Sequence, residues 1–483
     1  MHAQSADLRP VQATRGLWGK GAIGFTWLMI LLFTWMMARF ALRNSFFIAD
    51  DFDHFQLATS LPFMEYLLTP IDVHFVPLHR LASALLLALA PLDFRLGLWA
   101  MVAIQLASSV MLALLLKRLR PGPWNPVLVV FFACNSTLLP LLIWWSAGIH
   151  RLPYILLTIT CLYCYLGYRD SRRLRDLVGC CICFVTALGF YSKAVLIPFY
   201  ILALEFCLSW RDGYRAIGRY KLGIVLLLLA VAYVGWYVMF APVLRGSGEA
   251  SIAVAIQITL TFFRVLGGLL LLHAAAGWGV SGALVALFWV SLIVFTCLRR
   301  RENLVFWTAL ISVLALNFLI IAASSRAQMF GVFLAFVPRY FLEVIYLITI
   351  FLCLILNPAA PAAVNNRRGG MGAGVLLVLF GVFYPVMAYQ SAKASFARVE
   401  APLHKQTQRF MSTLLSDLDK MPAAQTIKIA EGSFPLYVYG QLMQVHKPFA
   451  DVLPLRYPNL QFVTREQAQF EIDSQGRVLP VTH

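Results

Sequence analysis

A short acidic run near the start of the chain is the first place where side chains could do chemistry. The run Asp50-Asp51-Phe52-Asp53-His54 places three carboxylates and an imidazole side by side. A carboxylate can accept a proton from a hydroxyl group or hold a divalent cation, and a neighbouring imidazole can position the second reactant. Charge of this density beside a membrane-spanning segment is costly unless it serves a function.

More residues of this kind follow in the same loop, which extends from about Arg39 to Pro77. The loop leads into Asp72-Val-His-Phe-Val-Pro-Leu-His-Arg, so that His74, His79 and Arg80 fall within one short stretch. The loop is long for a connection between two apolar segments. Its length and its composition both favour a functional site.

A structural role is the alternative for the acidic residues. Asp50 could cap the N-terminus of a short helix, with Asp51 and Asp53 complementing the helix dipole. This role accounts for one or two acids, but it leaves the two histidines and the arginine that follow unexplained. The functional interpretation explains more of the residues, and both stay open at this point.

The composition is that of a polytopic membrane protein. The 483 residues are 60% hydrophobic and only 13% charged, with a mean hydropathy of +0.77, which exceeds what a soluble core can bury. A net charge of +17 would suggest a nucleic-acid partner in a soluble protein. Here the basic residues form short clusters between apolar segments, as the positive-inside rule demands, so we expect membrane lipids and no nucleic acid. These clusters are Lys117/Arg118/Arg120, Arg169/Arg172/Arg173/Arg175, Arg211/Arg215/Arg219/Lys221, Arg299/Arg300/Arg301 and Arg367/Arg368.

Placing every cluster in the cytoplasm predicts about eleven membrane spans, each long enough to cross ~30 Å of hydrocarbon. The N-terminal segment 1–20 is then cytoplasmic and, because the apolar stretch after it lacks a small-residue cleavage site, the first span is retained. The C-terminus lies outside. The predicted spans are 22–38, 98–117, 125–143, 153–168, 177–191, 194–209, 222–240, 281–298, 304–322, 340–357 and 372–389.

Two further apolar stretches, Phe75–Ala90 and Ile256–His273, are left out of this count. Counting either as a crossing would place the clusters after it on the wrong side of the membrane. We predict that both form juxtamembrane or re-entrant helices at the outer face, where Arg80 and Arg264 reach water or phosphate.

The last segment, 391–483, changes character. Its polar content rises, and alternating runs near 425–430 and 460–464 predict β-strands. We therefore predict an all-α polytopic membrane protein with a small C-terminal α/β domain. Its parts are a cytoplasmic N-terminus (1–20), a transmembrane domain (21–390) with a long first periplasmic loop (39–97), and a periplasmic domain (391–483).

Several motifs taken in order resemble the GT-C superfamily of integral-membrane glycosyltransferases, which includes the protein O-mannosyltransferases and the lipid A aminoarabinose transferase. The resemblance covers most of residues 20–390, and its weight comes from the order of the motifs together with the topology. One departure is Ala194, since many relatives have Lys-Glu where this chain has Lys193-Ala194. The motifs are Asp50-Asp51 after the first span, His-Phe-x-Pro-Leu-x-Arg from His74 to Arg80, Trp144-Trp-Ser-Ala-Gly-Ile-His-Arg151, Ser192-Lys-Ala-Val-Leu-Ile-Pro198 and Pro338-Arg-Tyr340.

The resemblance implies a polyprenyl-phosphate sugar donor and a catalytic carboxylate. Asp50 takes the position of the catalytic base, and Asp51 assists as a second carboxylate or as a metal ligand. Cations on the outer side of the membrane would stabilise the phosphate that leaves. Five basic residues lie there, outside the positive-inside clusters, and snorkelling to lipid headgroups is the alternative role for each. They are Arg80, Arg151, Lys193, Arg326 and Arg339.

The remaining candidates are assigned to the acceptor or to a metal. Asp53, His54, His74 and His79 are candidates for acceptor binding, and Tyr340 for stacking on a sugar ring. A divalent cation, Mg²⁺ or Mn²⁺, would have Asp50, Asp51 and His54 as candidate ligands. The run Phe330–Val337 is expected to form a mobile loop that closes over the donor.

We therefore expect an enzyme of a bacterial inner membrane that transfers a sugar, with inversion, from a polyprenyl-phosphate donor to a periplasmic lipid, glycan or protein such as a pilin. A ligase or polymerase of preassembled, pyrophosphate-linked glycans is the first alternative. A transporter or flippase of a lipid-linked saccharide is the second. It should carry ionisable residues at mid-membrane depth, where the predicted spans mainly offer Gln105, Asn135 and Asn317, with Glu205 and Glu343 towards the span ends.

Overall fold

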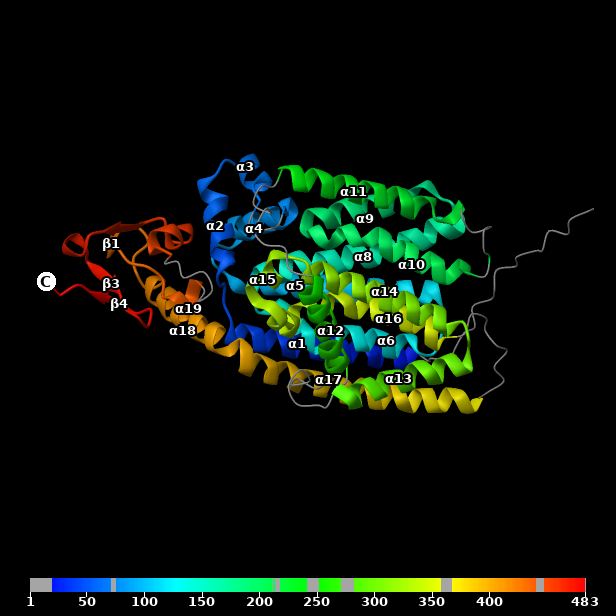
Figure 1. The fold of residues 1–483 in the computed structure, drawn as a ribbon. Coiled ribbons are helices and arrows are strands. Elements are labelled where there is room, and N and C mark those ends of the chain that lie inside the picture. The colour runs from blue at the N-terminus through cyan, green and yellow to red at the C-terminus, as the bar shows by residue number, and fades with distance from the viewer. Residues whose placement is uncertain are drawn as a thin grey trace, which may run out of the picture.

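The protein is a helical multi-pass membrane protein with a small domain at one end. The computed structural model describes residues 20–70, 75–210, 212, 218–240, 252–270, 282–357, 367–439 and 447–482. Most of the long helices run side by side in one bundle, and the C-terminal domain extends from one end of that bundle (Figure 1).

Every predicted span coincides with one helix or with a run of consecutive helices. Long apolar sequences favour this outcome because a backbone in hydrocarbon must satisfy its hydrogen bonds within the segment. The elements are α1 (Lys20–Asn44), α5 (Phe94–Leu119), α6 (Asn125–Ala133), η1 (Ser136–Leu138), α7 (Leu139–Leu142), α8 (Trp145–Ser171), α9 (Leu174–Phe190), η2 (Ser192–Leu196), α10 (Ile197–Ser209), α11 (Lys221–Phe240), α13 (Gly282–Arg299), α14 (Asn303–Ala322), η6 (Pro338–Tyr340), α16 (Leu342–Leu356) and α17 (Arg367–Val399).

Nine helices in the described part of the chain are long and apolar enough to cross a membrane. All of them except α12 (Ile252–Leu270) match predicted spans. The predicted spans 177–191, 281–298 and 372–389 form helices α9, α13 and α17, which are outside this set of nine.

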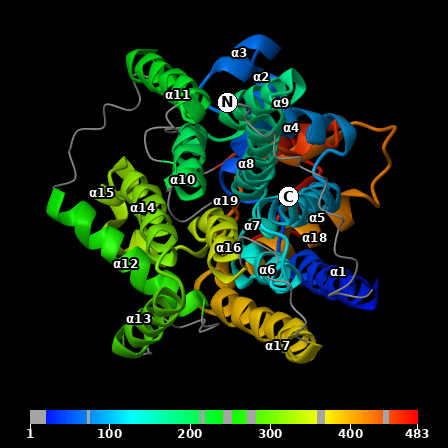
Figure 2. The same cartoon turned by 90° about the vertical axis from the view of Figure 1, so that its right-hand side faces the viewer.

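The helix α12 differs from the others in its direction. It runs across the long helices in Figure 1, and Figure 2 shows it lengthwise where α8 is seen nearly end-on. Ile258 and Phe262 on one side are buried, whereas Ile256 and Leu260 on the other are exposed. An amphipathic helix across the bundle fits the predicted surface position better than a crossing, although its length and composition allow either.

Three short helices follow α1 before the next long helix. They are α2 (Asp50–Ser60), α3 (Phe63–Leu68) and α4 (Pro77–Leu89). With 13 residues, α4 is about 20 Å long, which is too short to cross the membrane, as predicted. The residue at the N-cap of α2 is Ala49, in a left-handed conformation with φ of 48°, and not Asp50. The three acids do occupy the first turn, as the structural alternative expected, but that alternative is wrong about Asp50 as the cap.

The C-terminal domain combines helix α18 (Ala401–Leu418) with a four-stranded sheet of order β2-β1-β3-β4. Strands β1 (Ile427–Ala430) and β2 (Leu460–Val463) form where the two alternating runs predicted strands. They pair in parallel, with Ile427 opposite Leu460. Strands β3 (Phe470–Ile472) and β4 (Val478–Pro480) were not predicted and pair antiparallel. Helix α18 buries one apolar face, which includes Phe410 and Leu414. The described shorter elements are α19 (Leu436–Tyr439), η7 (Phe449–Asp451), η8 (Leu453–Leu455) and η9 (Arg465–Gln467).

Candidate functional site

Asp51 is fixed between its own helix and the N-terminus of α8. Its Oδ2 accepts a hydrogen bond from the backbone N–H of Ile48 at 3.0 Å. Its Oδ1 accepts two from Ser146, one from the backbone N–H at 2.7 Å and one from the hydroxyl at 2.6 Å. The side chain is fully buried. These bonds hold α2 against the Trp144-to-Arg151 motif, which is 95 residues away in the sequence.

The start of α8 reaches this position because Gly148 allows a close approach. A Cβ at Gly148 would lie 2.3 Å from the carbonyl oxygen of Leu141 on α7. Only glycine fits at that distance. The small residue therefore sets where Ser146 and its neighbours meet the acidic run.

Asp50 lies beside Asp51 but has a different environment. Its Oδ1 accepts a hydrogen bond from Nε1 of Trp144 at 2.9 Å. Burial raises the pKa of Asp50 to about 6, against the lowering effect of the Trp144 bond and of Arg339 and Arg326. Burial, together with the charge of Asp50, raises the pKa of Asp51 to about 8. At neutral pH Asp50 is thus the ionised member of the pair and Asp51 the protonated one.

Three of the predicted phosphate-binding arginines gather around Tyr340. The guanidinium of Arg339 lies 4.6 Å from the ring centre of Trp144 and 5.7 Å from that of Tyr340. Arg326 Nη1 donates to the Tyr340 hydroxyl at 3.4 Å, and Arg151 lies 5.3 Å from the same ring. Trp144 therefore has Asp50 at its edge and an arginine over its face.

Arg151 and Lys193 share one buried carboxylate. Arg151 Nε lies 2.5 Å from Oε1 of Glu343, and Lys193 Nζ lies 2.7 Å from Oε2. All three side chains are buried, with Glu343 fully so. The triad carries a net charge of +1, so Glu343 compensates part of the predicted positive charge.

Glu343 was not among the predicted site residues. The signal was present, because a carboxylate in the apolar sequence of α16 requires a cationic partner. Residue 194 is Ala, and the carboxylate that pairs with Lys193 comes from Glu343 on α16.

A column of aromatic rings leads from the acidic run to the cations. The ring centres of His54 and His79 are 4.2 Å apart, and those of His79 and His150 are 5.7 Å apart. Tyr191 follows at 4.8 Å from His150, and Arg151 lies 5.4 Å from the Tyr191 ring. The column brings together two predicted acceptor residues, His54 and His79, and two rings that were not predicted. His74 lies outside the described residues.

Arg80 contacts a different part of the structure from the other predicted cations. Its Nη1 donates to the carbonyl oxygen of Tyr66 at 2.5 Å, and the Tyr66 hydroxyl donates to the carbonyl oxygen of Arg80 at 3.0 Å. The guanidinium also lies 4.9 Å from the Tyr66 ring. Burial lowers the pKa of Arg80 to about 10. These contacts join α3 to α4, so the described geometry gives Arg80 a structural role.

The C-terminal domain contacts the acidic helix directly. Lys447 Nζ lies 3.0 Å from Oδ1 of Asp53 and also donates to the side chain of Gln56. The rings of Phe52 and Phe434 stack at 5.8 Å. Asp53, a predicted acceptor residue, is therefore held in an ion pair with the domain.

Two titratable residues near the start of α18 complete this side of the site. Burial raises the pKa of Glu400 to about 7, against the opposing charge of Arg339. Burial and the charge of Arg339 lower the pKa of His404 to about 3, and its Nδ1 lies 2.7 Å from Oγ of Ser45. Sequence reasoning missed both residues because the tail resembles nothing that would assign them a role.

The predicted metal ligands do not form a ready site. Among the described residues no group of three or more His, Cys, Asp and Glu side chains has the spacing to hold a metal ion. Both oxygens of Asp51 already accept hydrogen bonds, and His54 faces His79. We therefore derive no step through a divalent cation.

The loop predicted to be mobile is compact in its local structure. Residues Gly331–Phe336 form the 3-10 helix η5 after α15 (Ser325–Phe330), and Leu334 and Ala335 are buried. Helix η5 packs against α12. Its movement over a donor stays a prediction.

The geometry thus unites most of the predicted residues. Asp50, Asp51, Arg151, Lys193 and Tyr340 belong to one connected cluster, which also includes Arg326 and Arg339. No protein-family model matches the chain, and no curated protein matches it. The function therefore has to be argued from these residues and their arrangement.

Proposed function

We propose that the protein is a GT-C-like glycosyltransferase of a bacterial inner membrane. It transfers a sugar from a polyprenyl-phosphate donor to an acceptor on the outer, periplasmic side, and its N-terminus lies in the cytoplasm. The observation that carries the proposal is the position of Trp144. Its indole N–H donates to Asp50 Oδ1 at 2.9 Å, and its ring centre lies 4.6 Å from the guanidinium of Arg339. A general base and a set of phosphate-binding cations are what glycosyl transfer from a lipid phosphate requires.

Asp50 is the residue suited to act as base. Its pKa of about 6 keeps it ionised at neutral pH while leaving it basic enough to accept a proton. Asp51, which is protonated and held by three hydrogen bonds, positions the helix that carries Asp50. In the proposed step the acceptor hydroxyl gives its proton to Asp50 and its oxygen forms a bond to the anomeric carbon.

The bond between the anomeric carbon and the phosphate oxygen breaks in the same step. The departing phosphate keeps that electron pair and gains negative charge. Arg326 and Arg339 are the cations best placed to stabilise it, because both are half-buried beside Tyr340, whereas Arg151 and Lys193 are buried in ion pairs with Glu343. Attack opposite the leaving group inverts the configuration of the sugar.

The five predicted cations thus divide into three roles. Arg326 and Arg339 bind the donor phosphate. Arg151 and Lys193 form ion pairs with Glu343 and add a fixed positive charge to the same cluster. Arg80 joins two short helices.

The acceptor side faces the C-terminal domain. Asp53, His54 and His79 line the α2 and α4 side of the cluster, and Tyr340 is available to stack on the sugar. Because Lys447 of the C-terminal domain pairs with Asp53, the acceptor reaches Asp50 beside this domain. The proposed acceptor is a lipid, a glycan or a protein.

The test is transfer by the purified full chain in detergent. The donor is a synthetic short-chain polyprenyl-phosphate sugar, and the acceptors are lipid A, a glycan and a periplasmic protein extract. We expect donor consumption with formation of free polyprenyl phosphate, and loss of at least 1000-fold in turnover for Asp50→Asn, on the order expected for a general base together with its charge.

Asp53→Asn is the matched comparison, since it removes an equal charge from the same helix turn but breaks only the ion pair with Lys447, so its turnover should fall several-fold at most. A near wild-type rate for Asp50→Asn would refute the assignment. Consumption of only a pyrophosphate-linked oligosaccharide would identify a ligase or polymerase. Movement of an unaltered lipid-linked saccharide across a vesicle membrane, with no donor cleavage, would identify a transporter.

A further inference from the structure

A second group of charged residues surrounds a small cavity at the opposite end of the bundle. The cavity is lined by residues from the end of α8 and the start of α11. These helix ends lie at the end of the bundle away from the C-terminal domain (Figure 1). Its volume is about 70 Å³, several times the space that one water needs. Its lining carries four basic residues and no acidic one: Tyr165, Tyr168, Arg169, Arg172, Gly218, Arg219, Lys221 and Leu222.

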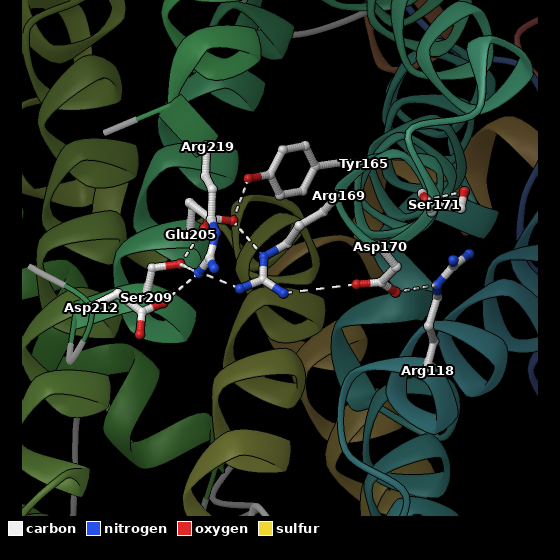
Figure 3. A network of polar contacts seen from close by, with 10 residues as sticks. Arg118, Tyr165, Arg169, Asp170, Ser171, Glu205, Ser209, Asp212 and Arg219 are labelled. Atoms are coloured by element: carbon white, nitrogen blue, oxygen red, sulfur yellow. Dashed lines mark hydrogen bonds and ion pairs between the residues drawn. The ribbon is translucent and has the colours of Figure 1, made fainter. Parts of the chain in front are cut away.

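A buried carboxylate holds part of this lining in place. Glu205 on α10 is fully buried and accepts hydrogen bonds from the Tyr165 hydroxyl at 2.6 Å and from Arg169 Nε at 2.8 Å. Ser209 donates to the same carboxylate and accepts from Arg219 Nη1 at 3.1 Å. Figure 3 shows Arg169 and Arg219 approaching Ser209 and Glu205 from different elements. The two arginines therefore have fixed positions.

The other two cations are not compensated. Arg172 and Lys221 form no ion pair with any carboxylate in the described part of the chain, and Arg172 lies 5.3 Å from the ring of Tyr168. Lys221 is the first residue of α11, where the helix dipole is already positive. A lysine there is unfavourable unless an anion is close by.

The positive-inside rule explains on which side of the membrane these residues lie, but not why they surround a cavity. Residues that only set orientation need contact nothing except water. Here the cations from α8 and the start of α11 converge, and a buried acid fixes two of them. Such a pocket between helices at the membrane surface suits a phosphate group.

The neighbouring surface of α11 indicates that the phosphate belongs to a lipid. Beyond Lys221 this helix exposes Ile224 (46%), Val225 (53%) and Leu228 (64%). Acyl chains attached to a phosphate in the cavity would lie along these side chains, whereas a free phosphate would use none of them. We propose that this pocket binds the headgroup phosphate of an anionic phospholipid, with its acyl chains against α11.

The test uses the purified full chain in neutral detergent. Lipid binding is measured by native mass spectrometry and by the shift in Tm with phosphatidylglycerol, with phosphatidylcholine, and with inorganic phosphate. We expect phosphatidylglycerol to bind and to raise Tm, and the other two to have little effect at equal concentration. Each of Arg172→Gln and Lys221→Gln should weaken binding about fivefold, and the double variant more than tenfold, since one cation near a lipid phosphate contributes about that factor.

Arg175→Gln is the matched control, because it removes an exposed charge from the same end of the bundle without touching the cavity. The Tm of each variant, measured without lipid, shows whether that variant is folded. If the double variant is unfolded, Lys221→Gln alone tests the proposal, because Lys221 is exposed. The proposal is overturned if the folded variants bind phosphatidylglycerol as the wild type does, or if Arg175→Gln weakens binding equally. It is also overturned if phosphatidylcholine binds as tightly as phosphatidylglycerol, or if inorganic phosphate raises Tm by the same amount.

Discussion

The indole N–H of Trp144 donates a hydrogen bond to Oδ1 of Asp50 at 2.9 Å. The face of the same ring lies 4.6 Å from the guanidinium of Arg339. The orientation of this one side chain therefore affects both the proposed base and the proposed phosphate-binding group. This contact can be altered without removing either charge.

We expect Trp144→Phe to shift the pH dependence of turnover. Phenylalanine keeps a ring for Arg339 but removes the N–H, which lowers the pKa of Asp50 by stabilising its ionised form. A hydrogen bond to a charged group contributes about 1.5–3 kcal/mol, so the acidic limb should move upward by roughly 1–2 pH units. The pH–rate profile measures this. An unchanged limb in an active variant would show that the bond does not tune the base.

In the wild type, turnover should rise with pH through about 6. Asp50 must be ionised to accept a proton, and its pKa is raised to about 6 by burial, so acidification below that value protonates it and stops transfer. Measured rates between pH 4.5 and 8 with a saturating donor would show this limb. A flat profile over that range would argue that another residue is the base.

The stability of the protein should change with pH in the opposite direction. Asp51 has an ordinary pKa of 3.8 in the unfolded chain and about 8 in the folded one, so the folded protein binds this proton more tightly. The free energy of unfolding contributed by Asp51 is therefore largest below about pH 4, falls as pH rises, and levels off above about 8. Asp51→Asn, which keeps an oxygen acceptor, should reduce this slope in thermal unfolding measured at several pH values. An identical slope in both proteins would contradict the assignment.

Glu343→Gln should destabilise the protein strongly. The substitution leaves Arg151 and Lys193 buried without their shared carboxylate. Breaking a buried ion pair by removing one partner costs about 3–5 kcal/mol. The additional change Lys193→Met should restore part of the loss in Tm because it removes one of the two uncompensated cations. Equal Tm values for Glu343→Gln and the wild type would show that the triad does not support the fold.

Lys447→Ala should reduce turnover with little change in stability. The ion pair with Asp53 is partly exposed, so it contributes about 1 kcal/mol or less. Its loss nevertheless loosens the contact that holds α2 against the C-terminal domain, and we expect turnover to fall several-fold. Lys420→Ala is the control, since it removes an exposed pair with Asp417 elsewhere in the domain. A similar fall in both variants would assign the effect to domain stability instead.

The transmembrane helices could be predicted because hydrocarbon imposes a simple requirement on each segment by itself. Runs such as 98–117 and 304–322 carry that information locally, and helices α5 and α14 follow them. The cluster of Asp50 with Arg339 and Lys193 was also foreseeable in outline. All of these residues lie in or beside connections that the predicted topology places on one side of the membrane.

The pairings within the site were not predictable from the sequence. Lys193 and Glu343 are separated by 150 positions, and nothing in either segment indicates that they meet. Arg80 shows the same limit, because its contacts with Tyr66 depend on how two short helices fold back on each other. Strands β3 and β4 were missed because segments of three residues are too short to establish an alternating pattern.

The ion pair between Asp53 and Lys447 spans 394 positions of the chain. The acidic helix is therefore synthesised long before Lys447, and until then only contacts made earlier in the chain, such as those of Asp51 with Ser146, can hold it. A nascent chain that ends before Lys447 already contains Asp50 and Arg339 but lacks this ion pair. The contact between the C-terminal domain and α2 therefore forms late in biosynthesis, after the helices that carry the other charged residues of the site have been made.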